Sequence, residues 1–422
     1  MTLAVFLASS RRTVSTVSLT QARLRGRVPT RRSALQAHLQ KAFSSTSAMA
    51  SSPSGSESPF HTVAITGASG MFGNAIIDEL LKKQDRKQML NGKQISIVKL
   101  IRSDTIPIED ASTLKEQQEA GERTIASLKW NPNAKGTGTD YAIHPDALKS
   151  IDTVIHLAGE NVGEGLLPGP LGSLGLRAWS QEKKDLILNS RVGPTQALAT
   201  AIAGCSEPTS FLVASGVGVY GNDFFMADEN DKDKERDAPD ESADVSNTKG
   251  FLAEVSRQWE AASQPAADAT AASPDNRIVN LRLAPIMSKA GGALGKLYPI
   301  FFLGGGGIVG SGKQYFSYIS ARDAARSMVH IIENDSIEGP VNVVAPTPAT
   351  NADFTSALGK VLSRPTIVPL PEFAVKLMFG EMGEEMLLGG VKATPKKLMD
   401  SGFEFQHESI EKALESAVHE TI

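Results

Sequence analysis

The sequence predicts an α/β protein with a doubly wound parallel sheet and a smaller C-terminal lobe. Three observations predict this class. Short β-rich runs alternate with helical patterns, two of those runs are apolar on both faces, and a glycine-rich turn joins the first run to the first helix. Alternating strands and helices form parallel sheets that helices cover on both faces.

The expected strands are the β-branched and apolar runs at 62–66, 95–101, 151–157, 211–215, 277–283 and 341–344. The expected helices lie between them, at 74–84, 180–204, 251–263 and 321–334. Two strands, IDTVIHL at 151–157 and RIVNLRL at 277–283, lack a polar face, which is typical of buried parallel strands. We therefore predict a nucleotide-binding domain over 57–285 and a substrate lobe over 286–422.

The turn after the first strand is the strongest sign of a ligand. Residues 62–73 read TVAITGASGMFG, with Gly67, Gly70 and Gly73 at the bend. The first glycine permits the turn, the second lets a phosphate approach the backbone, and the third lets helix and strand pack closely. The phosphate would then lie on free N–H groups at the helix N-terminus. We expect a dinucleotide site of the Rossmann kind here, to which Ser69, Met71 and Phe72 also contribute; an ordinary βα loop is the alternative.

The end of the second strand indicates which dinucleotide binds. An NAD site places Asp or Glu there to accept the ribose 2′-hydroxyl, whereas this chain has Arg102. A guanidinium suits a 2′-phosphate, so the sequence favours NADP over NAD. A surface arginine at a strand end is the alternative interpretation.

The first 56 residues differ in composition from the rest. They contain no Asp or Glu, eight Lys or Arg, and many Ser and Thr. This composition predicts an organellar transit peptide over 1–56, for a mitochondrion first and a plastid second. A disordered tail that carries no address is the alternative.

Charge and cysteine content exclude several classes. The chain has 43 basic and 47 acidic residues, so that without 1–56 its net charge is near −12. This argues against nonspecific nucleic-acid or anionic-membrane binding, and no apolar run is long enough to span a bilayer. The single cysteine, Cys205, forms no internal disulfide, and no Cys/His cluster has zinc-ligand spacing, so we expect no metal.

Three segments interrupt the pattern and are expected to be surface insertions. Residues 163–176 are rich in Gly, Leu and Pro, and residues 264–275 are of low complexity. Residues 222–250 carry ten acidic and four basic residues, which indicates a solvated loop. A lid or a partner-binding segment is the alternative for that loop.

Several motifs resemble one family. The patch HLAGEN at 156–161 resembles the end of the fourth strand in extended short-chain dehydrogenases/reductases, and ASGVGVYG at 214–221 resembles their fifth-strand segment. With FLAEVSRQWEAA, GGALGKLYPIFFLGGGG, GSGKQYFSYI and GEMGEEMLLGG in order, the chain is similar to the atypical "epimerase family" branch of the SDR39U1 type. The resemblance implies cofactor contacts at Leu157, Ala158, Gly159 and Ile286.

The catalytic pair of ordinary family members is missing. They use a tyrosine as proton donor and a lysine four residues later, which lowers the pKa of that tyrosine. None of the five tyrosines has lysine four residues on. At the expected place, the start of the 251–263 helix, stand Phe251 and Val255.

Three other residues are candidates for the active site. Ser215 ends the fifth strand above the expected crevice and could hydrogen-bond substrate or nicotinamide; the alternative is a strand-end serine with internal partners. Tyr220 follows in the loop and is the best remaining proton donor, with aromatic packing as the alternative. Arg191 stands where ordinary members have an asparagine that faces the active site, so it could hold cofactor phosphates or an anionic substrate. A salt bridge with Glu160 or another nearby acid is the alternative for Arg191.

The sequence therefore favours an NADP-dependent oxidoreductase acting on an unknown small molecule. An NADP(H)-binding regulatory or scaffold protein with little turnover is the second hypothesis, because the Tyr/Lys pair is absent. A nucleotide-sugar epimerase is the third hypothesis, because its reaction needs the same missing tyrosine. The sequence does not indicate an oligomeric state.

Overall fold

The computed structural model describes residues 58–105, 108–119, 125–135, 140–163, 179–222, 238–268 and 276–419. By its internal contacts the chain divides after Ser58, and the described elements belong to the unit Pro59–Ile422. The expected transit peptide, 1–56, lies outside the described residues.

Seven described strands form one parallel sheet. They are β1 (Phe60–Thr66), β2 (Gln94–Arg102), β3 (Ile125–Trp130), β4 (Thr153–His156), β5 (Ser210–Gly216), β6 (Arg277–Leu283) and β10 (Gly339–Val343). Their order is β10-β6-β5-β4-β1-β2-β3, and every neighbouring pair is parallel. The order reverses between β1 and β4, and ligands of such sheets bind in the crevice outside the carboxyl ends of the strands at this switch point.

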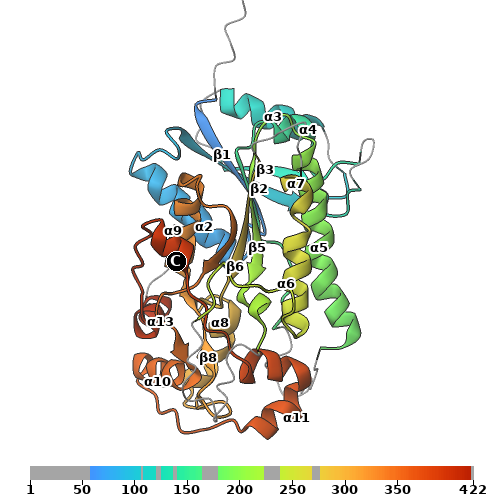
Figure 1. Ribbon diagram of the computed structural model, residues 1–422. Coiled ribbons are helices and arrows are strands. Elements are labelled where there is room, and N and C mark those ends of the chain that lie inside the picture. Colours follow the sequence, from blue (N-terminus) through green and yellow to red (C-terminus); the bar gives the residue numbers. More distant parts are fainter. Residues whose placement is uncertain are drawn as a thin grey trace, which may run out of the picture. The chain divides into compact units, whose positions relative to one another are not determined.

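Helices cover both faces of the sheet (Figure 1). On one face α2 (Met71–Asp85) lies beside α9 (Ala321–Glu333), and on the other α5 (Gln181–Ala203) lies beside α6 (Phe251–Ala261) and α7 (Gln264–Ala267). Helix α3 (Ile108–Glu119) packs against β3, and the short helix α4 (Pro145–Leu148) packs against α3. No helix in the described part of the chain is both long and apolar enough to span a bilayer.

The described residues after β6 supply the remaining elements. The helices are α8 (Gly292–Phe302), α10 (Asn351–Leu362), α11 (Glu372–Gly383), α12 (Lys396–Asp400) and α13 (Ile410–His419). Two small sheets pair β7 (Ile286–Met287) with β9 (Ile319–Ser320), and β8 (Tyr315–Phe316) with β11 (Ala349–Thr350). Two single turns are η2 (Val217–Tyr220) and η3 (Glu384–Leu388). A separate apolar core, which includes Leu294, Phe354 and Leu414, holds α8, α10 and α13 together.

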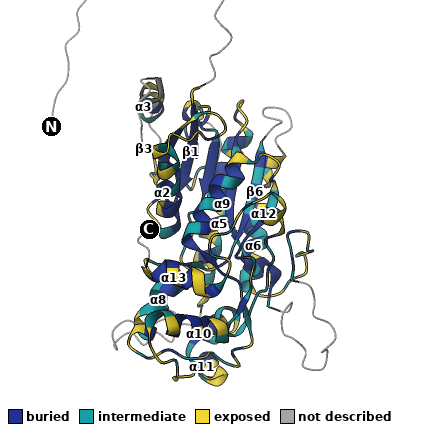
Figure 2. Ribbon diagram, turned by 90° about the vertical axis from the view of Figure 1, so that its left-hand side faces the viewer, coloured by how far each residue is buried: buried dark blue, intermediate teal, exposed yellow. Residues whose placement is uncertain are grey.

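Burial explains why the central runs form strands. Every residue of β1 and of β4 is buried, and Figure 2 shows the sheet dark between its helices. Helix ends are fixed by side-chain caps: the Ser180 hydroxyl accepts from the Lys183 N–H at the start of α5, and Thr350 and Asp353 form a capping box on α10. The six expected strands and four expected helices are confirmed, each within a few residues.

One strand of the sheet was not expected from the sequence. β3, IASLKW, lies at the sheet edge, and only Leu128 and Trp130 of its side chains are buried. An edge strand that is half exposed carries mixed polar and apolar residues, so its hydrophobic signal is weak.

The expected lobe and insertions are partly built into the main sheet. Although we assigned 286–422 to the lobe, β10 of this stretch is the edge strand beside β6. Residues 164–178, 223–237 and 269–275 lie outside the described residues. In the rest of the 222–250 segment, however, Glu241 is buried and accepts N–H groups of Asn342 and Lys397. The segment therefore packs on the fold around Glu241, whereas residues 242–250 are exposed or half-buried, as expected for a solvated loop.

Candidate functional site

The glycine turn has the geometry that a pyrophosphate site requires. Gly67 has φ +67°, and a Cβ there would meet the Leu157 carbonyl carbon at 3.2 Å. A Cβ on Gly73 would lie 2.4 Å from the Gly67 carbonyl oxygen, so only glycine lets α2 approach the turn. Helix α2 starts at Met71, and its N-cap residue, Gly70, makes no side-chain capping bond. The first N–H groups of α2 are thus available to an anion.

A buried hydroxyl joins the ends of β1 and β4. Thr66 Oγ1 accepts the N–H groups of Leu157 (3.0 Å) and Ala158 (3.3 Å) and lies 2.7 Å from His156 Nδ1. Because the oxygen already accepts twice, its own proton points to Nδ1, and His156 carries its proton on Nε2. That nitrogen has no described hydrogen-bond partner, and the Trp130 ring meets the imidazole edge-on. His156 is therefore a structural residue that fixes the 157–159 backbone beside Gly67.

Burial, with a smaller contribution from the charge of Arg191, lowers the pKa of His156 from 6.5 to about 3. The unfolded chain therefore binds one more proton than the folded one between these two values, so stability is lost as pH falls from 6.5 toward 3. We expect His156→Asn, which keeps an acceptor for Thr66, to make this acid loss shallower by up to about 1.4 kcal/mol per pH unit. Urea unfolding between pH 7 and pH 4 measures the slope, and His419→Asn, at an exposed histidine, is the control. Parallel slopes for wild type and His156→Asn would contradict the assignment.

The structure brings most of the predicted cofactor residues to one edge. Arg102 is exposed at the carboxyl end of β2, two residues beyond the Thr66–Leu100 pair that aligns β2 with β1. Ser69 is exposed in the turn, and Met71 packs against the backbone at Gly291, where the chain returns from β7. These positions surround the α2 N-terminus.

Two other predicted cofactor residues can contribute less directly. The Phe72 side chain belongs to the core between α2 and the sheet, so only its backbone faces the turn. Ile286 is half-buried in β7, where it pairs with Ile319. It follows Pro285 after β6, and Pro285 lines a pocket at the carboxyl ends of β5 and β6.

Arg191 is a buried cation at the crevice. Its guanidinium donates to the carbonyl oxygens of Ile187 (2.9 Å) and Glu160 (2.8 Å), and its Cζ stacks 4.8 Å from the Trp259 ring centroid. The Glu160 carboxylate pairs with Lys183 at 2.6 Å, and the hydrogen bond that Arg191 makes to Glu160 goes to the backbone carbonyl. Burial lowers the pKa of Arg191 to about 10, and the negative charge of Glu160 opposes this shift. The Arg191 guanidinium therefore stays charged at pH 7.

Arg191 connects the turn with a pocket. A Cβ on the exposed Gly159 would lie 3.1 Å from Arg191 Cζ, so the guanidinium lies directly beside the 157–159 patch. Arg191 also lines a cavity of about 330 Å³ at the carboxyl ends of β5 and β6. This volume is that of a small-molecule site.

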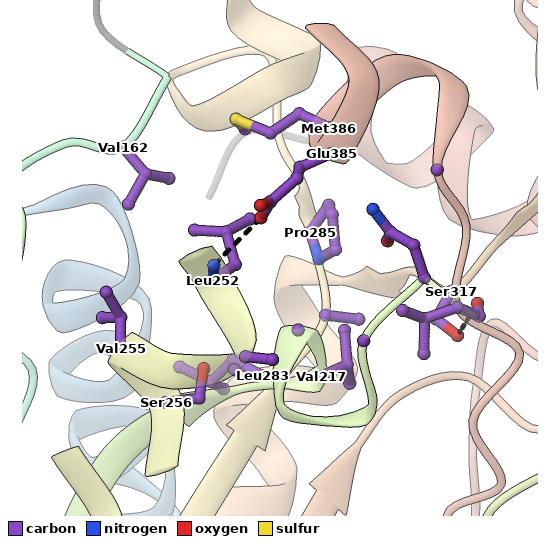
Figure 3. Close-up of a pocket in the computed structure, with 18 of the residues that line it drawn as sticks. Val162, Val217, Leu252, Val255, Ser256, Leu283, Pro285, Ser317, Glu385 and Met386 are labelled. Atoms are coloured by element: carbon purple, nitrogen blue, oxygen red, sulfur yellow. Dashed lines mark hydrogen bonds between the residues drawn. The ribbon is translucent and has the colours of Figure 1, made fainter. Parts of the chain in front are cut away.

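The pocket walls come from four parts of the chain. The floor is made by Ser215, Gly216 and the η2 turn, which follow β5, and by residues 283–285, which follow β6. One side is helix α6, with Leu252, Val255 and Ser256. The opposite wall is C-terminal, with Phe316, Ser317, Glu385, Met386 and residues 389–391. Figure 3 shows Val162, Val255 and Met386 around the same space, with Glu385 hydrogen-bonded to Leu252.

A buried network below the pocket holds both predicted catalytic residues. The Ser215 hydroxyl donates to Glu260 Oε1 at 2.8 Å, and Glu260 is paired through both oxygens with Arg282. Since a carboxylate only accepts, the single proton of Ser215 is directed to Glu260. Ser215 therefore lines the pocket as a hydrogen-bond acceptor.

Contrary to our expectation of an active-site proton donor, Tyr220 does not face the pocket. It is fully buried and is not among the residues that line the cavity. Its hydroxyl accepts from Arg282 at 3.0 Å and lies 2.8 Å from Asn342 Oδ1. Burial raises the pKa of Tyr220. The geometry gives Tyr220 a structural role, because its proton is buried in the network and away from the cavity.

The place of the missing Tyr/Lys pair is occupied in a different way. Phe251 packs edge-on against Trp179, and Val255 is buried in the pocket wall. The carboxylate of Glu385 accepts the N–H groups of Phe251 (2.6 Å) and Leu252 (2.9 Å) and so caps α6. Burial raises the pKa of Glu385, and these two hydrogen bonds oppose that rise.

Sequence reasoning missed Glu260 and Glu385. Glu260 lies in the amphipathic 251–263 pattern, where an acidic residue looks like ordinary surface. Glu385 is 134 residues from its partner Phe251. No local signal marks either contact, since both depend on how distant elements pack.

The chain is similar to several known proteins. A family model described as "Domain of unknown function (DUF1731)" matches residues 370–417, which include the C-terminal pocket wall from Glu385 to Val391. An epimerase family protein of Mycobacterium bovis is 33% identical over 352 residues, 83% of this chain and 96% of that protein. The human epimerase family protein SDR39U1 is 32% identical over 298 residues, 70% of this chain and 91% of that protein. A crystal structure of human SDR39U1 (isoform 2) with NADPH matches with a TM-score of 0.64 and 26% identity, over 85% of this chain and all of that one.

Proposed function

The chain belongs to the epimerase family proteins of the SDR39U1 type, which are atypical short-chain dehydrogenases/reductases, and on this premise we propose that it is an NADP(H)-dependent oxidoreductase. The cofactor would lie with its pyrophosphate on the N-terminus of α2 and its nicotinamide at the carboxyl ends of β5 and β6. The substrate would occupy the cavity between α6 and the C-terminal wall.

The observation that carries this proposal is the uncapped N-terminus of α2 above the Gly67–Gly73 turn, at the same sheet edge as an open pocket. Hydride transfer is the chemistry that the cofactor supplies, and the protein binds and orients the reactants. Gly67, Gly70 and Gly73 shape the phosphate cradle. Arg191 presents a fixed cation beside it, and Arg102 stands where a 2′-phosphate would lie. The NADPH of the human relative supports the choice of cofactor.

A second candidate function has its own support. Phe251 and Val255 cannot transfer protons, Tyr220 is buried in a network, and Ser215 directs its proton to Glu260. A protein that binds NADP(H) and turns over slowly, as a regulatory or scaffold protein, fits these facts. Missing acid–base catalysis costs roughly 10²–10⁴-fold in rate.

One experiment separates the two functions. Residues 57–422 are purified, NADPH binding is followed by its fluorescence, and NADPH oxidation is measured against a panel of aldehydes and ketones. Turnover with any carbonyl supports the oxidoreductase. Tight NADPH binding without turnover supports the regulatory function, and no NADPH binding at all overturns both.

We expect Arg102→Ala to weaken NADPH binding by roughly ten- to a hundredfold and to leave NADH binding unchanged, because a guanidinium contact to the 2′-phosphate is a charge-assisted bond. Titration of the variant with both cofactors measures this. Lys99→Ala, on the same strand but before its carboxyl end, is the control. An equal loss for NADPH and NADH would show that Arg102 does not read the 2′-phosphate.

We further propose a mitochondrial location, with a plastid as the alternative, from the acid-free and arginine-rich composition of residues 1–56. Fusion of residues 1–56 to a fluorescent protein tests the address. A fusion that stays in the cytosol would contradict it.

A further inference from the structure

The chemistry of the pocket lining points to a kind of substrate. Most of the lining is apolar, and it includes Val162, Leu252, Val255, Phe316 and Met386. Among the described residues that line it, only Arg191, Lys249 and Glu385 carry charge. Burial of apolar surface must therefore supply most of the binding free energy of any ligand here.

The two cations are poorly placed to serve a substrate phosphate. The Arg191 guanidinium is held by the Ile187 and Glu160 carbonyls and stacked on Trp259, on the side of the cavity next to Gly159. This is the cofactor side. Lys249 is exposed, so solvent screens its charge.

The helix end that could bind a substrate anion is already occupied. Phe251 and Leu252 begin α6, and their N–H groups are those that an anion would use. The Glu385 carboxylate takes both, at 2.6 and 2.9 Å, and a Cβ on Gly250 would lie 3.2 Å from its Oε1. The pocket thus has a built-in anion in its wall, where a nucleoside diphosphate would need cations.

We infer that the pocket takes an uncharged, largely apolar carbonyl compound and that Glu385 is the residue that excludes anionic substrates, nucleoside diphosphate sugars among them. The carbonyl part of this inference rests on the proposed oxidoreductase function. Two like charges about 5 Å apart weaken binding by roughly a hundredfold or more at the dielectric of a partly buried site. The C-terminal wall would then select the substrate as well as close the pocket.

The test compares two ligands of one shape and different charge. 2-Acetonaphthone and 2-naphthoate share an apolar body, and UDP-glucose serves as the nucleotide-sugar probe. Binding to NADPH-loaded residues 57–422 is measured at pH 7.5 by calorimetry, without need of turnover. The variant is Glu385→Gln, which keeps one acceptor for the α6 cap, and Glu384→Gln removes the neighbouring exposed charge as a matched control.

We expect the wild type to bind the ketone at least about tenfold more tightly than the naphthoate, and UDP-glucose not to compete. Glu385→Gln should reduce the ketone preference severalfold, whereas Glu384→Gln should keep it. Equal affinity for ketone and naphthoate in the wild type overturns the inference, as does competition by UDP-glucose or an unchanged preference in folded Glu385→Gln. If Glu385→Gln does not fold, the wild-type preference alone decides.

The design keeps the two proposals apart. Ketone discrimination measured in protein that does not bind NADPH would uphold the pocket inference and sink the proposed function. NADPH oxidation with a carbonyl in a protein that does not prefer the uncharged ketone over the naphthoate would do the reverse.

Discussion

Arg282→Ala is expected to lower the free energy of unfolding by about 3–5 kcal/mol, because it leaves a buried carboxylate without its partner. The Arg282 side chain is 4% exposed and that of Glu260 15%. Both Glu260 oxygens accept from Arg282, at 2.9 and 3.0 Å, and Tyr220 accepts a third bond. One substitution thus removes the donors of three hydrogen bonds in the floor of the pocket.

Chemical denaturation followed by circular dichroism measures this loss. Lys396→Ala breaks the exposed pair with Asp400 and is the matched control, for which little change in stability is expected. A loss for Arg282→Ala no larger than for Lys396→Ala would mean that water enters and solvates Glu260. The network would then not be the rigid support of Ser215 that the geometry indicates.

Gly73→Ala is expected to cost about 1–3 kcal/mol of stability, as overpacking does, and to weaken NADPH binding by roughly tenfold or more. The added Cβ would lie 2.4 Å from the Gly67 carbonyl oxygen and 2.7 Å from Ala68 Cα. Both are backbone atoms, so the helix must move away from the turn. That movement shifts the N–H groups that would hold the pyrophosphate.

NADPH fluorescence titration and thermal unfolding measure the two effects. The control is Gly193→Ala in α5, where a new Cβ meets nothing within 4 Å and where alanine suits a helix better than glycine. The control should bind NADPH normally and be at least as stable as the wild type. Normal NADPH affinity in Gly73→Ala would show that the turn does not hold the cofactor.

Local patterns predicted the fold well. The first strand, the glycine turn and the first helix all lie within residues 60–85, and their signals are propensity, burial and glycine geometry. The edge strand β3 was not predicted, because a half-exposed strand has no strong apolar pattern. The burial of Glu241 in the acidic segment was not predicted either, since it depends on Asn342 and Lys397, about 100 and 156 residues away.

The site was predicted only in part. Gly67, Gly73 and Arg191 were named from sequence, and the structure places them at one crevice. Ser215 lines the pocket as expected, but its hydrogen-bond direction depends on Glu260, which no pattern marks. The prediction of Tyr220 as an active-site proton donor was wrong, because its hydroxyl points into the network with Arg282.

By itself the sequence determined the parallel sheet, the dinucleotide turn and the absence of the Tyr/Lys pair, because each depends on residues close together in the chain. Only the tertiary structure decided what replaces that pair. Glu385 reaches α6 from the C-terminal segment, and Glu260 meets Ser215 and Arg282 below the pocket. Such contacts join residues far apart in sequence, so they arise from packing and leave no local pattern.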